Sequence, residues 1–337
     1  MSLLKVSNLD VRYALAGSLK AKIAGLANRY LDAVIDVSFE VARGTTLAIA
    51  GESGSGKSTL ARAIIGLTPF ASGKIEFDGA QPLVKGGGGS RAYHRNVAMM
   101  FQDPVSSLSP RRTVQSLITE PFIVHGLRDR DLAAEANRLL LLVGLPKDFA
   151  SRYPHQLSGG QARRVGVARA IALNPKLILA DEPTAGLDVS VQGDILNLLA
   201  RLQGEFGLTY VIITHNLAVV RHVSDTSAIM YMGRFVEFGP TAEIFARPLH
   251  PYAAALIAAQ PNPDPKRRRT TPVLMGEVTS LRNRPSGCEF HPRCSSMKDT
   301  CARIIPPVTS PDPSHMVRCH FPIAHEGSQP VRQSSGQ

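Results

Sequence analysis

A glycine-rich stretch that ends in Lys-Ser-Thr lies near the N-terminus. The stretch 51–59 reads Gly-Glu-Ser-Gly-Ser-Gly-Lys-Ser-Thr and fits the pattern G-x-x-x-x-G-K-[ST]. Its glycines let backbone N–H groups turn inward around phosphate at a helix N-terminus, where Lys57 would reach the β- and γ-phosphates and Ser58 would ligate magnesium. A glycine-rich surface loop is the alternative, but the strand-like segment before the stretch and the helix-like segment after it favour nucleotide binding. The predicted nucleotide-binding residues are Gly51, Ser53, Gly54, Ser55, Gly56, Lys57, Ser58 and Thr59.

Three further polar side chains follow apolar runs that are typical of buried strands. Asp181 and Glu182 come after residues 177–180, and His215 comes after 211–214. A carboxylate at the C-terminal edge of a sheet could hold magnesium through water, and the next carboxylate could orient and deprotonate an attacking water. An Asp-Glu pair could instead be a solvated helix cap, and a lone histidine at a strand end is more often structural. With a phosphate loop upstream, we predict that Asp181 serves magnesium and that Glu182 is the general base.

Three other features add to this set. The stretch Leu-Ser-Gly-Gly-Gln at 157–161 opens an arginine-rich helix, and Gln102 follows the apolar run 97–101. Ser158, Gly159 and Gly160 carry no acid or base, but amides and a hydroxyl at a helix start would suit a γ-phosphate. Tyr13 ends a strand-like segment where an aromatic ring could stack on adenine. Predicted nucleotide contacts are therefore Tyr13, Ser158, Gly159, Gly160 and Gln161, and Gln102 could sense magnesium and the attacking water.

The order of these motifs resembles that of the ABC-transporter ATPases over roughly residues 3–258. Residues 101–104 running into 107–110, the Pro-Leu-His-Pro-Tyr segment at 248–252 and a cysteine-containing tail also resemble the oligopeptide and dipeptide importer ATPases. The resemblance implies an α/β P-loop NTPase of ABC type, with a parallel core sheet, an antiparallel β subdomain, a helical signature subdomain and a small cysteine-containing C-terminal extension.

The same resemblance implies roles for individual residues. The catalytic residues would be Glu182, His215 and Gln102, with His215 as the switch histidine at the γ-phosphate. Ser58, Gln102 and Asp181 would serve magnesium, and Asp188 would lie at a subunit boundary. The Leu-Ser-Gly-Gly-Gln stretch at 157–161 would be the signature of this family, and it would close over ATP held by a second ATPase subunit. Ala162-Arg163 replaces the Arg-Gln that often follows the signature, and Asn216 replaces the Asp that often follows the switch histidine. Neither departure removes a catalytic atom.

The remaining patterns describe the elements that must position these residues. Apolar strands alternate with helices from residue 46 onward, which predicts a parallel sheet covered on both faces. Alternating segments at 3–13, 34–41 and 74–79 predict an antiparallel sheet beside it. We expect an ATP-binding domain at 1–258 with a helical subdomain at about 103–175, an extension at 259–322 and a disordered tail at 323–337.

All four cysteines lie in the predicted extension. Cys288, Cys294, Cys301 and Cys319 are separated by 5, 6 and 17 residues, without the C-x-x-C pair of common zinc ribbons. In a reducing compartment, this clustering indicates metal ligation rather than disulfides. Four thiolates in an irregular loop predict a [4Fe–4S] cluster, to which the family resemblance also points. A zinc ion and unligated buried cysteines are the alternatives.

Composition bears on location and partners. The chain has 337 residues and a net charge of +11, which suggests an anionic neighbour such as nucleic acid or acidic lipid. No uncharged apolar run approaches the roughly 18 residues needed to span a bilayer, and the N-terminus lacks a secretory pattern. We expect a peripheral protein on the cytoplasmic face of the bacterial plasma membrane. Residues 14–30 could form a basic amphipathic helix at lipid headgroups or an extended hairpin loop.

These expectations combine into one predicted function, which is ATP hydrolysis that powers import of di- or oligopeptides. The expected partners are two transmembrane permease subunits, a second and different ABC ATPase subunit and, indirectly, an external substrate-binding protein, with no nucleic acid. An importer ATPase for another solute, such as nickel or a peptide-like compound, is the alternative. An ABC ATPase acting on ribosomes or DNA fits less well, because the chain has one cassette and no sustained heptads. Glu182 and His215 argue against a binding module without hydrolysis.

Overall fold

The computed structural model describes residues 2–15, 30–83, 87–103, 107–127, 129–260 and 280–325. The strands are β1 (Ser2–Ala14), β2 (Tyr30–Ala42), β3 (Thr46–Ala50), β4 (Ser72–Phe77), β5 (Val97–Met100), β6 (Leu177–Asp181), β7 (Thr209–Thr214), β8 (Thr226–Tyr231), β9 (Arg234–Pro240), β10 (Val308–Asp312) and β11 (His315–Arg318). The α-helices are α2 (Lys57–Ile64), α3 (Arg91–Asn96), α4 (Val114–Val124), α5 (Leu132–Leu142), α6 (Gly159–Ile171), α7 (Val189–Phe206), α8 (Leu217–Val223), α9 (Thr241–Ala246), α10 (Pro251–Ala258) and α11 (Asp299–Arg303).

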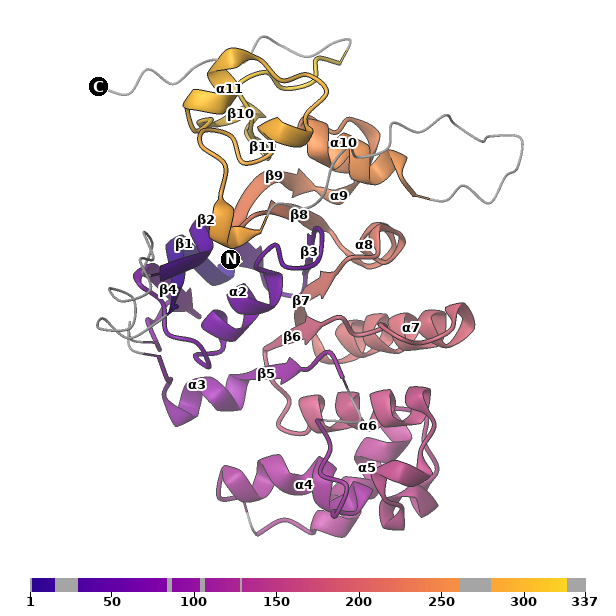
Figure 1. Ribbon diagram of the computed structural model, residues 1–337. Helices are drawn as coiled ribbons and strands as arrows, with labels where there is room; N and C mark the ends of the chain where they lie inside the picture. Colours follow the sequence, from indigo (N-terminus) through magenta and orange to yellow (C-terminus); the bar gives the residue numbers. More distant parts are fainter. Residues whose placement is uncertain are drawn as a thin grey trace, which may run out of the picture.

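A mixed sheet runs through the centre of the molecule (Figure 1). Its eight strands follow the order β10-β11-β9-β8-β3-β7-β6-β5, and the five from β8 to β5 are parallel. Each parallel strand is short and almost wholly apolar because both of its faces are covered. In β3, for example, Leu47 and Ile49 face one hydrophobic cluster while Ala48 and Ala50 face another. The predicted parallel core sheet is confirmed.

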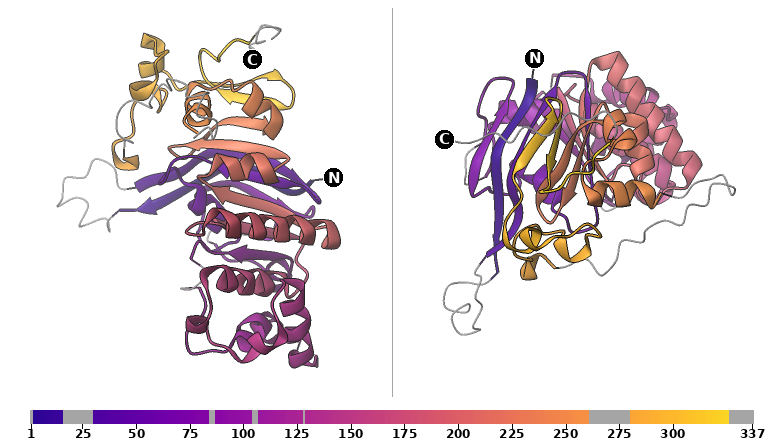
Figure 2. Two further views of the ribbon diagram at one scale, coloured as in Figure 1. Left: turned by 90° about the vertical axis from the view of Figure 1, so that its right-hand side faces the viewer. Right: turned by 90° about the horizontal axis from the view of Figure 1, so that it is seen from above.

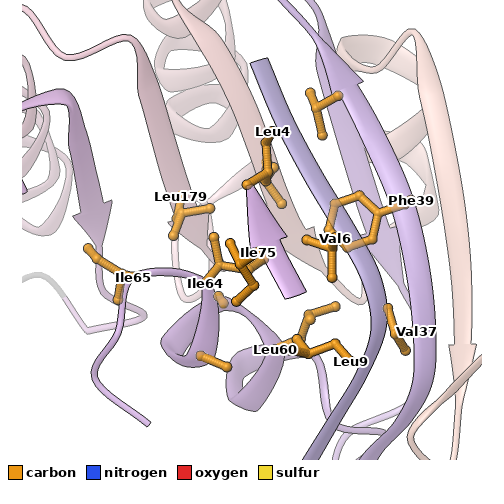
Figure 3. Close-up of a cluster of buried hydrophobic side chains, with 14 of the residues drawn as sticks. Leu4, Val6, Leu9, Val37, Phe39, Leu60, Ile64, Ile65, Ile75 and Leu179 are labelled. Carbon is orange, nitrogen blue, oxygen red and sulfur yellow. The ribbon is translucent and has the colours of Figure 1, made fainter. Parts of the chain in front are cut away.

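A second, three-stranded sheet of order β2-β1-β4 is antiparallel, as the alternating segments predict. It packs beside the main sheet, and α2 lies between the two. Figure 3 shows Leu60 and Ile64 of α2 among Val6 of β1, Ile75 of β4 and Leu179 of β6. All of these side chains are buried, so this cluster fixes the helix that carries Lys57 and Ser58 against both sheets.

Helices α4, α5 and α6 form the end of the molecule opposite the C-terminal extension (Figures 1 and 2). Polar residues define where they start, because Thr113, Asp131 and Ser158 each accept a hydrogen bond from a backbone N–H of the first turn. Apolar residues of these helices and of α7 pack against the face of β6 and β7 that carries Ile178 and Ile212. The predicted helical character between residues 103 and 175 is therefore seen in the structure.

The extension is attached to the main sheet. Strand β11 pairs with β9 through Met316 and Val317, and β10 pairs with β11, so the sheet continues into the residues after 280. Phe290 is buried with residues of α8, α9 and α10, and Cys288 and Cys294 pack against the same cluster. The extension and the cassette thus share both a sheet and an apolar core, and the division near residue 258 stays a prediction.

Some predictions fall on residues that the structure does not describe. The proposed amphipathic segment at 14–30 lies outside the described residues except at its ends, where Ala14 pairs with Tyr30 across the β1–β2 hairpin. Residues 261–279 of the predicted extension and most of the predicted tail at 323–337 also lie outside them. Among the residues that are described, no helix has the length and apolarity needed to cross a membrane.

Candidate functional site

The glycine-rich loop 51–56 connects the buried strand β3 to helix α2 at the C-terminal edge of the parallel strands. Two of its glycines are required by the fold. Gly51 has φ 151° and Gly56 has φ 105°, and an added Cβ would meet the carbonyl oxygens of Met230 at 2.1 Å and Ala33 at 2.3 Å, respectively. Any side chain there would displace the neighbouring backbone, so the loop keeps its tight path only with glycine. The predicted strand–loop–helix order is present.

Lys57 lies within the curve of this loop. Its Nζ donates hydrogen bonds to the carbonyl oxygens of Gly51 and Glu52, each at 2.8 Å. The residue is only 6% exposed, and burial lowers the pKa of its amine against the opposing effect of Glu182 and Asp181. A cation is thus held at the start of α2, where the helix N-terminus also favours negative charge.

Ser58 and Asp181 meet from two different elements. The Ser58 hydroxyl donates to Asp181 Oδ1 at 3.0 Å, which joins the first turn of α2 to the end of β6. Burial raises the pKa of Asp181, while the bond from Ser58 and the nearby Lys57 and Arg62 act in the opposite direction. A hydroxyl and a carboxylate are the oxygen ligands that magnesium usually takes from such proteins, with phosphates and water completing its shell. The residues present therefore fit a nucleotide-bound magnesium ion.

Glu182 and His215 also lie together. Glu182 Oε1 accepts a hydrogen bond from the His215 backbone N–H at 3.1 Å and lies 2.7 Å from His215 Nδ1. Glu182 is 8% exposed and has φ 51°, a left-handed backbone conformation that is uncommon outside glycine. Such a conformation needs support from its surroundings, and here it orients the carboxylate toward His215, which directly follows β7.

Gln102 lies two residues after the end of β5, and its side chain is exposed. It lines a pocket of about 700 Å³ together with Asp181, Arg62 and Phe101. Arg163, from the signature helix, donates to the Gln102 carbonyl at 3.0 Å. The structure therefore brings Gln102 and the proposed magnesium ligand Asp181 to one pocket, and the role of the Gln102 side chain stays a prediction.

Tyr13 and the signature residues lie farther from this centre. Tyr13 is exposed near the end of β1 and pairs with Leu31, which lines a separate pocket of about 320 Å³ beside the phosphate loop. Ser158 and Gly159 are exposed at the start of α6. There Ser158 Oγ accepts a hydrogen bond from the Gln161 N–H at 3.3 Å, and Gln161 Oε1 accepts one from the Ser158 N–H at 2.9 Å. This capping box fixes the exposed signature turn, and its predicted contact with a nucleotide on a second chain is a proposal.

The four cysteines are free thiols in the structure. Cys301 is buried and the other three are half-buried, and the Cys288 N–H donates to the Cys301 carbonyl at 2.7 Å. Burial raises the pKa of Cys288 to about 12 and that of Cys319 to about 11, and neighbouring thiols add to each shift. Over the described ranges, no three His, Cys, Asp or Glu side chains gather closely enough to hold one metal ion.

Sequence reasoning missed two buried arginines. Arg163 marks a departure from the usual signature, but the sequence does not indicate that it reaches the carbonyls of both Gln102 and Ala185. Arg293 pairs with Glu52 of the phosphate loop, 241 positions away in the chain. No local pattern could have found the second contact, because it forms only when the extension folds against β8 and α10.

Comparisons with known proteins agree with this geometry. Residues 34–185 match the family model described as ABC transporter, and residues 236–301 match the one described as oligopeptide/dipeptide transporter, C-terminal region. The oligopeptide transport ATP-binding protein AppF of Bacillus subtilis is 45% identical over 86% of this chain and 89% of its own length. OppF of Haemophilus influenzae, which carries the same description, is 41% identical over 94% of this chain and 96% of its own length.

A similar solved structure is a dimeric ATP-binding cassette in a post-hydrolysis state, bound to ADP and phosphate. It superimposes with a TM-score of 0.60 at 28% sequence identity, and the match covers 71% of this chain and 98% of that one. The predicted ABC-type fold is confirmed, and the comparison covers the cassette.

Proposed function

The chain belongs to the ATP-binding proteins of oligopeptide and dipeptide ABC transporters, and on that premise we propose that it hydrolyses ATP to power peptide import through separate permease subunits. One observation supports the proposal most directly. At a single edge of the parallel sheet, Lys57, the Ser58–Asp181 pair and the Glu182–His215 pair lie around the phosphate loop. These are a phosphate-binding cation, a pair of magnesium ligands and a base with an orienting partner, as phosphoryl transfer to water requires.

Each residue has a defined task in this proposal. Lys57 and the loop amides bind the β- and γ-phosphates, and magnesium held near Ser58 and Asp181 supplies neutralisation of their charge. Glu182 orients a water molecule and takes its proton. His215 Nδ1, acting as a donor, steadies the Glu182 carboxylate and leaves Nε2 free to face the γ-phosphate. Gln102 senses magnesium and the attacking water from the pocket of about 700 Å³ that it lines together with Asp181.

Two substitutions test the assignment in the assembled transporter. Glu182→Gln retains the shape of the side chain but cannot accept a proton, so we expect ATP binding to persist while hydrolysis falls by at least about 100-fold. Lys57→Ala should instead weaken ATP binding itself. Nucleotide affinity and phosphate release are measured for both variants, together with peptide uptake. Near-normal hydrolysis by the Glu182→Gln variant would remove this residue from the role of base.

The partners follow from the same proposal. The chain binds two permease subunits at the cytoplasmic face of the membrane and pairs with a second, different ATPase subunit, while an external binding protein delivers the peptide. Membrane permeases and a dimeric ATPase are implied by the family. Copurification from native membrane, with identification of the bound chains and cargo, tests each of these partners.

We also propose that the four cysteines ligate a [4Fe–4S] cluster with a structural role. The support is chemical, since four free thiols lie in one irregular unit and neighbouring thiols help to raise the pKa of Cys288 and Cys319. Cys288, Cys294, Cys301 and Cys319 would hold such a cluster as thiolates, and it is a larger group than the single metal ion for which the described residues offer no site. Thiols whose pKa is raised by burial become thiolates readily only beside positive charge, which iron would provide.

Anaerobic purification tests the cluster. We expect a brown protein whose broad visible absorption is bleached by dithionite, with iron and acid-labile sulfide in the preparation. Replacing any one of the cysteines with Ser should expose the extension to proteases, because few of its own apolar side chains, such as Phe290 and Val317, are fully buried and its fold depends on the ligand. A colourless protein with one zinc per chain and no iron would contradict the cluster and favour the zinc alternative.

A further inference from the structure

Glu52, the second residue of the phosphate loop, is tied directly to the C-terminal part of the chain. Its two carboxylate oxygens accept hydrogen bonds from Arg293 Nη1 at 2.7 Å and Nη2 at 2.9 Å. Its backbone N–H donates to the Tyr252 hydroxyl at 3.0 Å, and its carbonyl accepts from Lys57 Nζ at 2.8 Å. The N–H, carbonyl and carboxylate of one loop residue are thus all bonded, two of them to elements beyond residue 250.

Arg293 itself is held in place. It ends the short 3-10 helix His291–Arg293, its side chain is 5% exposed, and its guanidinium carbon lies 5.9 Å from the centre of the Tyr231 ring. That ring packs against Tyr252 at 4.7 Å and Phe290 at 5.4 Å between ring centres. A bidentate arginine–carboxylate pair is geometrically specific, and a packed aromatic cluster beside it limits its movement.

The start of the extension also lies beside the same loop. Arg284 donates to the carbonyl oxygens of Met232 at 2.5 Å and Asp32 at 3.0 Å, and this fixes the start of the extension against β2 and the turn after β8. The neighbouring residues Leu281 and Arg282 then line the pocket of about 320 Å³ that residues 52–55 of the phosphate loop also line. The extension therefore meets the loop at two places.

From these contacts we propose that Arg293 is a positioning residue of the nucleotide site, through which the C-terminal extension sets the conformation of the phosphate loop. The inference rests on the proposed function, because it concerns the ATP affinity of that site. Arg293 neutralises Glu52 and fixes its carboxylate, while Tyr252 accepts the hydrogen bond from its backbone N–H. Without Arg293, an uncompensated carboxylate would stand at the edge of a loop that must receive a polyphosphate, and it would compete for Lys57, which already bonds to the Glu52 carbonyl.

A double-mutant cycle tests this role. Wild type, Arg293→Gln, Glu52→Gln and the double variant are compared by equilibrium binding of a fluorescent ATP analogue with magnesium. We expect each single variant to bind roughly tenfold more weakly, within the usual range of coupling between sites. The double variant should bind no more weakly than either single one, because both substitutions remove one interaction. Arg303→Gln, which alters an exposed pair with Asp299 in the same extension, is the matched control and should bind like wild type.

The outcomes separate this inference from the proposed function. A wild-type protein that does not bind the ATP analogue contradicts the proposed function. Wild-type binding with unchanged affinity in Arg293→Gln, or with fully additive losses, contradicts the positioning role alone. If Arg293→Gln does not fold, as judged by thermal unfolding, Arg293→Lys is used instead, because lysine keeps the charge but not the bidentate geometry. Arg293→Lys should still bind the analogue more weakly than wild type, and equal affinity overturns the proposal.

Discussion

Arg163 joins the signature helix to two loops of the hydrolysis site. It is 2% exposed and donates to the carbonyl oxygens of Gln102 at 3.0 Å and Ala185 at 2.9 Å. Burial lowers the pKa of its guanidinium, and the nearby Asp103 and Glu182 act in the opposite direction. One side chain thus holds the loop after β5 and the loop after β6 at a fixed separation. Arg163 occupies a position after the signature where glutamine is common.

We predict that Arg163→Gln loosens this connection. A single glutamine amide is shorter than the guanidinium and cannot reach both carbonyls, so one buried acceptor loses its partner, at a cost of about 1–3 kcal/mol in unfolding free energy. ATP hydrolysis in the assembled transporter should fall several-fold, while ATP affinity stays near wild type because Lys57 and the loop are untouched. Urea unfolding and phosphate release measure the two effects. Arg138→Gln, which alters an exposed arginine paired with Glu135, is the control. Unchanged stability and turnover would show that the bridge is dispensable.

At the scale of elements, helix α10 depends on a buried histidine at its start. His250 Nδ1 accepts the Tyr252 N–H at 3.0 Å, and the His250 N–H donates to Glu237 Oε2 at 2.8 Å. Burial lowers the pKa of His250 to about 3. The cap therefore needs a neutral imidazole, because a protonated Nδ1 cannot accept the bond that Tyr252 offers.

This arrangement predicts an acid-sensitive helix. In the unfolded chain His250 takes up a proton below about pH 6.5, whereas the folded chain resists protonation down to about pH 3, so stability is complete above pH 6.5 and is lost as the pH falls. At pH 5 the loss from this residue is about 2 kcal/mol. His250→Asn keeps a capping side chain without the titration, so its unfolding free energy should depend less on pH between 7 and 5. Urea unfolding of both proteins is measured at each pH, so that the contributions of all other groups, which the two proteins share, cancel in the comparison. Parallel plots of unfolding free energy against pH would contradict the assignment.

Much of this architecture could be predicted because its signals are local. Short apolar runs such as 46–50 and 177–181 identify parallel strands, and the Gly-rich loop identifies the turn after β3. The Glu182–His215 contact was not predicted, because it depends on β6 and β7 being neighbours in the sheet, and the strand order is known only from the structure. The pairing of β11 with β9 and the ion pair of Arg293 with Glu52 had no such signal. They depend on how a segment with little periodicity folds onto a finished sheet, and only the tertiary structure specifies that.

At the scale of the whole molecule, one chain does not bring its signature to its own phosphate loop. Ser158 and Gly159 are exposed on the helical end of the molecule, and neither lines the pockets beside Gln102 or the loop 52–55. The similar cassette of known structure is dimeric in its product-bound state. A second chain is therefore expected to supply the signature that completes each site, and the site of an isolated chain lacks those donors.

We predict that the purified chain hydrolyses ATP slowly and that a different ATPase subunit, added with the permeases, raises the rate.

The identity of the partner can be tested by complementation between two inactive variants. Lys57→Ala retains an intact signature, and Gly159→Asp retains an intact phosphate loop but places a negative charge where the γ-phosphate would lie. In a homodimer, mixing the two variants would assemble one complete site and restore hydrolysis. For a chain that pairs with a different subunit, the mixture should stay as slow as either variant alone. Addition of the second subunit to the Lys57→Ala chain should then restore hydrolysis at the second subunit's phosphate loop, because the signature of the Lys57→Ala chain completes that site. Recovery from mixing the two variants, or isolation of a transporter with two identical copies of this chain, would contradict the heterodimer.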